Sequence, residues 1–230
     1  MSRDVRPVSA VPAAVLALLA ASLAAQIALQ TMRNAGIDAA APLPPAPGAD
    51  ALRLASFGEP EAAARLAMVH VQTYRNPDYR RLVDWLESIL ALDPRSQYPL
   101  FSAARVYAET ADAERSRLML EFVHRHFLLD PPRRWPWLAH AALIAKHRLK
   151  DLRLARSYAQ SLERHAGAGD LPLWARQMEI FILEDMNELE AARIMIAGLL
   201  ASGTLHDPAE IRFLKQRLDE LEARLAAGKR

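Results

Sequence analysis

Few residues in this chain have the chemistry to bind a metal ion or to catalyse a reaction. His124 and His126 form a close pair, but side chains two residues apart on a helix point about 200° away from each other, so they cannot share one metal ion without distortion. His140 and His147 lie two helical turns apart, which is too far for one metal ion. The chain has no Cys and no Gly-rich phosphate loop, nucleophile elbow or paired metal-binding His motif. We therefore expect neither enzyme activity nor a metal ion or other cofactor.

A second group of polar residues has the chemistry to bind a protein. Arg105, His140 and Arg176 each follow a proline by four or six residues, and Lys146 lies in the same stretch as His140. On neighbouring helices these residues would form a mildly basic groove that receives an acidic peptide or a C-terminal carboxylate, because guanidinium groups form forked contacts with carboxylates. The alternative is an ordinary solvated helix face, and the sequence leaves both interpretations open.

Aromatic residues stand at matching positions in the same pattern. Trp135, Trp137 and Trp174, together with Phe101, lie next to the prolines or within a few residues of them. They would either line a binding face as an aromatic row or pack one repeat against the next, and packing is the favoured interpretation. Trp135 precedes the expected helix, so we expect it to be the most exposed of the four and a candidate partner contact.

The elements that position these residues follow a repeat in the sequence. Pro60, Pro99, Pro136, Pro172 and Pro208 are spaced 39, 37, 36 and 36 residues apart, and a helix-like run follows each of them. Proline fits the first turn of a helix, where its missing N–H has no intrahelical partner. Self-similarity at a fixed period of this size is typical of solenoid proteins. We therefore expect one helix to begin at each of these prolines.

A second helix in each repeat is indicated by its cap or by its end. Leu92-Asp93-Pro94 and Leu129-Asp130-Pro131 are one period apart, and each closes a run of apolar residues at helical spacing. Asn76-Pro77 is the predicted cap of the first of these runs, and Asp151 is the predicted cap of residues 152–165. Because the chain has only 8 Gly and few β-branched runs, the predicted fold is all-α, an α-solenoid of antiparallel helix pairs.

The run after Pro208 places five apolar residues three and four positions apart. These residues are Ile211, Leu214, Leu218, Leu221 and Leu225. The run is either a C-terminal capping helix that covers the last repeat or the seam of a homodimer that resembles a coiled coil. It spans barely two heptads, and a confident coiled-coil prediction needs three or four, so capping is favoured.

The N-terminal segment is predicted to anchor the chain in a membrane. Val8–Leu29 contains no charged residue, and Arg3 and Arg6 precede it. A spanning helix needs about 20 predominantly apolar residues, so residues 1–30 are expected to hold an N-terminal transmembrane helix. The alternatives are a cleaved signal peptide with its site at Ser22-Leu23-Ala24 and a buried helix. The Arg flank favours a cytoplasmic N-terminus, with the remaining chain on the other side of the membrane.

Composition divides the rest of the chain into a linker and a domain. Residues 31–50 are rich in Pro and Ala, which predicts a semi-rigid linker that holds the following domain away from the bilayer. Residues 51–230 form the predicted helical-repeat domain. The 29 Lys and Arg residues nearly balance the 27 Asp and Glu residues, so there is no electrostatic footprint for nucleic acid.

The second helices resemble those of the tetratricopeptide-repeat family. The likeness is carried by Asp78–Pro94, which is similar to the second helix of that family through its closing Asp-Pro, and it covers roughly residues 60–205. The resemblance implies protein–protein adaptor work on the concave face of the first helices. With the N-terminal anchor, it implies a membrane-anchored scaffold or chaperone-type adaptor of the bacterial envelope, set in the inner membrane with a periplasmic domain. The alternatives are an enzyme with an unrecognised site and a structural subunit of a multi-protein membrane complex.

Overall fold

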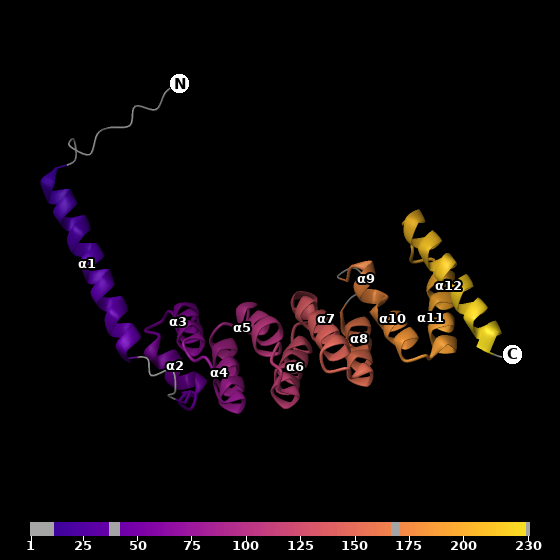
Figure 1. Ribbon diagram of the computed structural model, residues 1–230, viewed down its shortest axis with the longest axis horizontal. Helices are drawn as coiled ribbons and strands as arrows, with labels where there is room; N and C mark the ends of the chain where they lie inside the picture. The colour runs from indigo at the N-terminus through magenta and orange to yellow at the C-terminus, as the bar shows by residue number, and fades with distance from the viewer. Residues whose placement is uncertain (1–11, 37–41, 167–170, 229–230) are drawn as a thin grey trace, which may run out of the picture.

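The protein is all-helical in the part of the chain that the structure describes. The computed structural model describes residues 12–36, 42–166 and 171–228, with the side chains of 13 and 29–36 left out. Within these ranges there is no strand (Figure 1), which confirms the all-α prediction for them. The helices are α1 (Ala13–Gly36), α2 (Ala49–Ala55), α3 (Pro60–Gln72), α4 (Tyr79–Leu92), α5 (Tyr98–Ser102), the π-helix η2 (Ala103–Tyr107), α6 (Ala113–Phe127), α7 (Pro131–His147), α8 (Leu152–His165), α9 (Leu173–Arg176), α10 (Met178–Asp185), α11 (Leu189–Ala201) and α12 (Pro208–Gly228).

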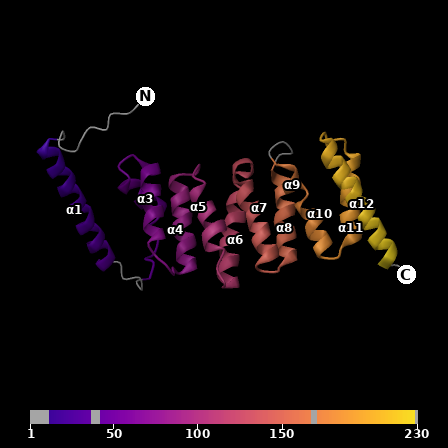
Figure 2. The ribbon, with the colours of Figure 1, turned by 45° about the horizontal axis from the view of Figure 1, so that its top comes forward.

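The helices from α2 to α12 lie side by side in one row, as the two views in Figures 1 and 2 agree. If α5 and η2 are taken as one helix, the extensive contacts join each helix only to the next one in the chain or to the one after that. Most of the buried apolar side chains form one core that runs from Leu43 to Ile182, and a second core lies around α11 and α12. The core is therefore spread along the row and is not gathered at one centre.

Hydrogen bonds between neighbouring helix pairs recur at a nearly constant separation in sequence. Arg134 donates to the Pro94 carbonyl and Trp137 Nε1 donates to Gln97 Oε1, both at 2.7 Å and both across 40 residues. Further pairs separated by 37 to 41 residues are Arg53 with Ala91, Arg81 with Leu43, Trp85 with Pro44, Ser88 with Pro47, Arg115 with Asn76, His124 with Ser161 and Arg148 with Thr110. From the start of the row to α8 this separation is close to the spacing of the repeated prolines. The side-chain bonds between the α9–α10 region and α12 span 33 residues instead.

Side-chain caps set the starts of α4, α6 and α8, whereas α11 begins without one. The Asp78 carboxylate accepts from the backbone N–H groups of Arg81 and Arg80, at 3.1 and 2.9 Å, and these bonds lower the pKa of Asp78. The predicted cap at Asn76-Pro77 is therefore wrong by two residues, because a carboxylate closer to the helix takes the role. Asp151 caps α8 as predicted.

The prediction that a helix begins at Pro136 is wrong, because α7 begins at Pro131 and contains Pro136. Pro131 and Pro132 occupy the first turn, where no N–H is needed. Asp130-Pro131 was predicted to close the preceding helix. It lies just after the end of α6, and it also forms the start of α7. The other repeated prolines do lie at helix starts: Pro60 and Pro208 are the first residues of α3 and α12, Pro99 is the second residue of α5, and Pro172 directly precedes α9.

Part of the predicted linker packs against the domain. Residues 42–48, called here the proline strap, run along α4, and Leu43 in the strap is fully buried. From one face of α4, Arg81 and Trp85 donate to the carbonyls of Leu43 and Pro44 at 2.8 Å, and Ser88 donates to that of Pro47 at 3.2 Å. Proline has no N–H, so in this segment the carbonyls are the main backbone groups that need partners. The packed chain thus begins before residue 51.

Helix α1 stands apart from the row in Figures 1 and 2. Its described side chains, residues 14–28, are all exposed. In the described part of the chain, no helix combines the length and the apolar character that crossing a membrane requires. The predicted span Val8–Leu29 begins among residues 1–11, which lie outside the described ranges, so its membrane insertion stays a prediction.

Helix α12 covers the C-terminal end of the row. Leu214 and Leu221 are buried in the second core together with Ile196 of α11, and Ile211 and Leu218 pack against it. Arg217 of α12 also donates from Nε to the buried Glu184 of α10 at 2.9 Å. Most of the apolar stripe of α12 is therefore occupied within the chain, which agrees with the capping interpretation.

We expect Leu86→Ala and Phe122→Ala each to lower the free energy of unfolding by about 2–5 kcal/mol, because both side chains are fully buried and the cavities cannot close completely. Chemical denaturation followed by circular dichroism measures the loss. Leu66→Ala is the matched control, because Leu66 is 71% exposed and its truncation should change stability by less than about 0.5 kcal/mol. Equal effects at the buried and exposed positions would contradict this packing.

We expect deletion of residues 207–230 to uncover Ile196 and Leu183, which are fully buried, and so to produce a monomer that aggregates. Size-exclusion chromatography with light scattering gives the mass and the aggregated fraction. A truncated chain that remains soluble and only changes from dimer to monomer would support the dimer-seam alternative.

Candidate partner-binding surface

Arg105 and His140 come from successive helix pairs and belong to one cluster. Arg105 is exposed on η2, whereas the side chain of His140 on α7 is only 18% exposed. His140 Nε2 lies 3.6 Å from Glu109 Oε1, and Arg148 lies 4.0 Å from the other oxygen of Glu109. Burial lowers the pKa of His140, the charge of Arg105 lowers it further, and Glu109 opposes both effects. At neutral pH the arginines therefore carry the positive charge of this cluster.

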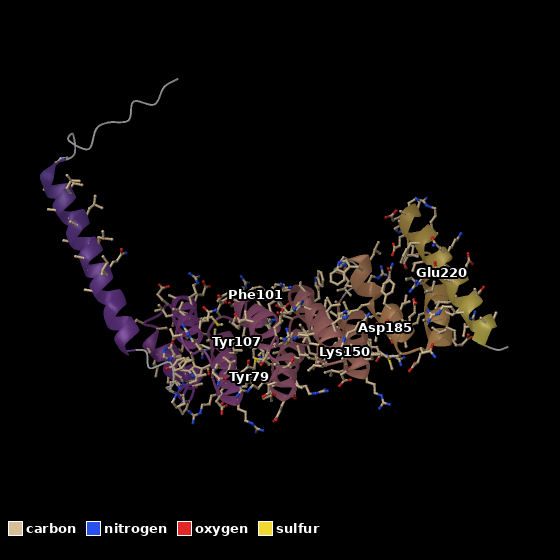
Figure 3. The ribbon with its side chains drawn as sticks, in the orientation of Figure 1. Tyr79, Phe101, Tyr107, Lys150, Asp185 and Glu220 are labelled. Carbon is tan, nitrogen blue, oxygen red and sulfur yellow. The ribbon has the colours of Figure 1, made fainter. Side chains whose placement is uncertain are left out.

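Lys146 of α7 is already engaged within the chain. Its Nζ lies 2.6 Å from Oδ2 of Asp185 at the end of α10, and its side chain is only 19% exposed. Asp185 and Lys150 line one hollow at this point of the row, where Figure 3 labels both. A carboxylate on a partner would have to compete with Asp185, so the observed role of Lys146 is to link α7 to α10.

Arg176 lies in different surroundings, on the short helix α9. It lines a hollow of about 370 Å³ together with Glu163 of α8 and Leu199 of α11. None of the residues that line this hollow belongs to the cluster around Arg105 and His140. Of the four predicted basic residues, the structure therefore brings Arg105 and His140 together and leaves Lys146 and Arg176 apart from them. Their role in binding stays a prediction.

The prediction that Trp135 precedes its helix and is the most exposed of the aromatic residues is wrong. It lies inside α7 and is half-buried, because α7 begins at Pro131, one turn earlier than expected. Its ring meets that of Trp174 edge to face, with centroids 5.9 Å apart. Trp174, at 51% exposure, is the more exposed member of the pair.

The remaining aromatic residues mainly join neighbouring helix pairs. Phe101 stacks on Tyr98 at 5.9 Å and meets the ring of Trp137 edge to face at 5.6 Å. Tyr98 is 47% exposed, and its hydroxyl accepts a hydrogen bond from Gln72 of α3 at 2.7 Å. The aromatic residues thus pack successive pairs together, and Tyr98 and Trp174 leave ring surface open to solvent.

An aromatic groove was missed by the sequence reasoning. It has a volume of about 450 Å³ and opens between the α3–α4 turn and η2. Tyr79 donates from its hydroxyl to the Tyr107 carbonyl at 3.0 Å, and the Arg115 guanidinium lies 5.2 Å from the centre of the Tyr79 ring; Figure 3 labels both tyrosines. Aromatic rings beside guanidinium groups suit peptide segments with aromatic or acidic side chains. The π-helix η2 lines this groove, and the spacing of apolar residues in the sequence does not predict it.

Arg134 is a second residue whose role only the structure shows. It is 4% exposed, and it donates to the His126 carbonyl as well as to the Pro94 carbonyl, both at 2.7 Å. It therefore acts inside the row and not as a surface charge. The sequence analysis did not predict this contact; the separation of 40 residues between Arg134 and Pro94, close to the proline period, is the sequence signal that could have found it.

The close His pair serves two separate contacts. His124 Nε2 hydrogen-bonds with Ser161 Oγ at 2.9 Å, whereas His126 Nε2 lies 3.5 Å from Glu87 Oε2. Among the described residues, no group of three or more His, Asp or Glu side chains is arranged to hold a metal ion.

Comparison of the chain with protein-family models, with curated proteins and with solved structures found no match.

We expect the protein to lose stability as the pH falls below about 6.5, the ordinary pKa of histidine. Burial lowers the pKa of His124, His126 and His140, so these groups stabilise the fold fully above that pH. At lower pH the unfolded chain takes up protons first, and stability falls until the pKa of the folded state is passed. Thermal denaturation between about pH 7.5 and 5.5, at constant ionic strength, measures the slope.

His140→Gln should make this slope shallower, because it removes one of the three buried groups. His147→Gln is the matched control on the same helix, since His147 is exposed. Identical slopes for the original chain and His140→Gln would rule out burial of His140 as a source of pH dependence.

Proposed function

We propose that the protein is a membrane-attached scaffold or chaperone-type adaptor that binds a partner protein along its row of helices. In this proposal the row is a solenoid of tetratricopeptide-like helix pairs. The observation that carries the proposal is the pattern of contacts, because the extensive contacts in the row join each helix only to the next one in the chain or to the one after that. Proteins built in this way present long continuous surfaces, and they use these surfaces to bind other proteins.

The proposed partner contact is centred on the first helices of the pairs, at Arg105. Its guanidinium is exposed, and no described residue forms an ion pair or a hydrogen bond with it. Arg176 likewise has no ion pair with a described residue, whereas Lys146 is held by Asp185. Arg105 is exposed and Arg176 is half-buried. Arginines without an ion-pair partner are available to a carboxylate on a bound protein, and such contacts weaken as salt rises. His140 belongs to the same proposed site, because its ring lies beside Glu109.

The proposed attachment to the membrane is through the N-terminal segment. The described large apolar side chains of α1 are exposed, among them Leu18 at 75%, Leu19 at 61% and Leu23 at 59%. An exposed apolar surface of this extent on an otherwise polar protein marks a site of contact with lipid or with another protein. The Arg3 and Arg6 flank favours an orientation with the row on the far side of the inner membrane, in the periplasm.

We expect Arg105→Glu combined with Arg176→Glu to abolish capture of the partner from a crosslinked detergent extract. Reversing the charge repels the carboxylates that the arginines are proposed to bind, while stability should change by no more than about 1 kcal/mol, as at other surface positions. Quantitative mass spectrometry of the captured proteins, together with the melting temperature of each variant, makes the measurement.

The matched control is Arg80→Glu combined with Arg164→Glu, which changes the charge equally at exposed positions on the second helices α4 and α8. This control should capture the same proteins as the original chain. Capture that survives the Arg105 and Arg176 changes, or that is lost equally in the control, would refute the proposed site. If no protein is enriched reproducibly by the original chain, the scaffold proposal itself fails.

A further inference from the structure

We propose that the α2–α3 end of the row rests on the surface of the lipid bilayer that holds α1. This inference rests on the proposed membrane attachment of the N-terminal segment, and it adds a second contact with lipid, made by the folded domain. The contacting residues are Leu54 and Phe57 in and beside the α2–α3 turn. The function of the contact is to hold the row close to the membrane in a fixed orientation.

The first support is the length of chain between α1 and the packed domain. Helix α1 ends at Gly36, and the next buried residue is Leu43 in the proline strap. Because a chain reaches at most about 3.3–3.6 Å per residue, the seven steps from Gly36 to Leu43 span about 25 Å at most, whatever path they take. The full linker of residues 31–50 would have reached about 70 Å by the same rule. The start of the row is thus confined to the neighbourhood of the end of α1.

The second support is the attachment of the strap itself. Leu43 has no exposed surface, and three donors from one face of α4 hold the carbonyls of residues 43, 44 and 47. Trp85, which supplies one of these donors, is 6% exposed and also contacts the ring of His70. The strap is therefore part of the domain, and it cannot lengthen the tether without losing a buried leucine and three hydrogen bonds.

The third support is the apolar character of the end of the row that faces α1. Figures 1 and 2 place α2 and α3 at this end. Leu54 is 83% exposed and Phe57 is 95% exposed, so the Phe57 ring makes almost no contact with the rest of the chain. Phe57 also has φ of +50°, a backbone conformation that is an outlier for a bulky side chain. A strained and exposed aromatic residue in a domain with a short tether is explained if its ring enters an apolar phase.

The charges at this end identify the kind of lipid contact. Asp50, Glu59 and Glu61 outnumber Arg53 and Arg65 in α2, α3 and their turn, so anionic head groups would not attract this surface. Apolar and aromatic side chains at the boundary between head groups and acyl chains supply the contact instead. The contact should therefore form on zwitterionic vesicles and should not require anionic lipid.

The experiment uses single cysteines, because the chain has none of its own. Three exposed alanines are replaced one at a time in the full-length protein: Ala21→Cys on α1, Ala55→Cys beside the α2–α3 turn, and Ala226→Cys on α12 at the other end of the row. Each variant is labelled with an environment-sensitive fluorophore and reconstituted into phosphatidylcholine vesicles that contain a lipid with a quencher on its acyl chain. We expect quenching at positions 21 and 55 and none at position 226.

A second variant tests the residues named here. Adding Leu54→Ser and Phe57→Ser to the Ala55→Cys chain should reduce quenching at position 55 by at least about twofold, because the side chains that enter the lipid are removed. Both residues are exposed, so circular dichroism and the melting temperature should show an unchanged fold. The same two changes in the Ala21→Cys chain should leave quenching at position 21 unaltered.

The outcomes separate this inference from the proposed anchor. Absence of quenching at position 21 would overturn the anchor and, with it, this inference. Quenching at position 21 without quenching at position 55 would overturn this inference alone. A label at position 55 that is shielded from an aqueous quencher but is not quenched by lipid would show that a protein occupies this surface, which also overturns the inference.

Discussion

The helices of the row bury their apolar faces against helices that lie one or two positions away in the chain. The main core runs from Leu43 to Ile182, and the extensive contacts along it join each helix only to the next one in the chain or to the one after that. A core of this kind has two ends that must be closed. The proline strap covers part of α4 through the fully buried Leu43, and α12 covers the second core through Leu214 and Leu221. The strap and α12 therefore bury apolar surface near the two ends of the row.

Polar side chains fix the register in which the pairs meet. A buried carbonyl or N–H without a partner costs free energy, so nearly all such groups in folded proteins are paired. Arg134 supplies donors to two carbonyls from different helices, and Trp137 reaches Gln97 of the preceding pair. A slip of one pair against the next would leave these groups buried and unpaired. The apolar faces drive the association, and the hydrogen bonds select one arrangement among those the faces allow.

The same local packing decides which charges are available for binding. Lys146 and Arg105 looked alike in the sequence, but Lys146 lies opposite Asp185 of a later helix and is neutralised by it. Arg105 lies on η2 with its guanidinium in solvent. Its positive charge contributes to lowering the pKa of His140. At the α2–α3 end of the row, apolar residues are exposed instead of charged ones. Leu54 and Phe57 lie there with almost no cover from the rest of the chain. Whether a side chain is exposed therefore depends on which neighbouring helices reach it, and the sequence near the residue does not record this.

The sequence by itself determined the helical content, the period and several helix boundaries. Helix starts at Pro60 and Pro208, the cap at Asp151 and the apolar stripe of α12 depend on steric and hydrogen-bonding preferences that act within a few residues. Only the tertiary structure decided that the strap packs on α4, that Trp135 lies inside α7, that Arg134 is buried and that Lys146 is paired. These outcomes depend on partners about 40 residues away in the chain, or on which of two possible starts a helix takes once its neighbours are in place. No short-range pattern records them, because the residues concerned look the same in the sequence whether a distant surface covers them or solvent does.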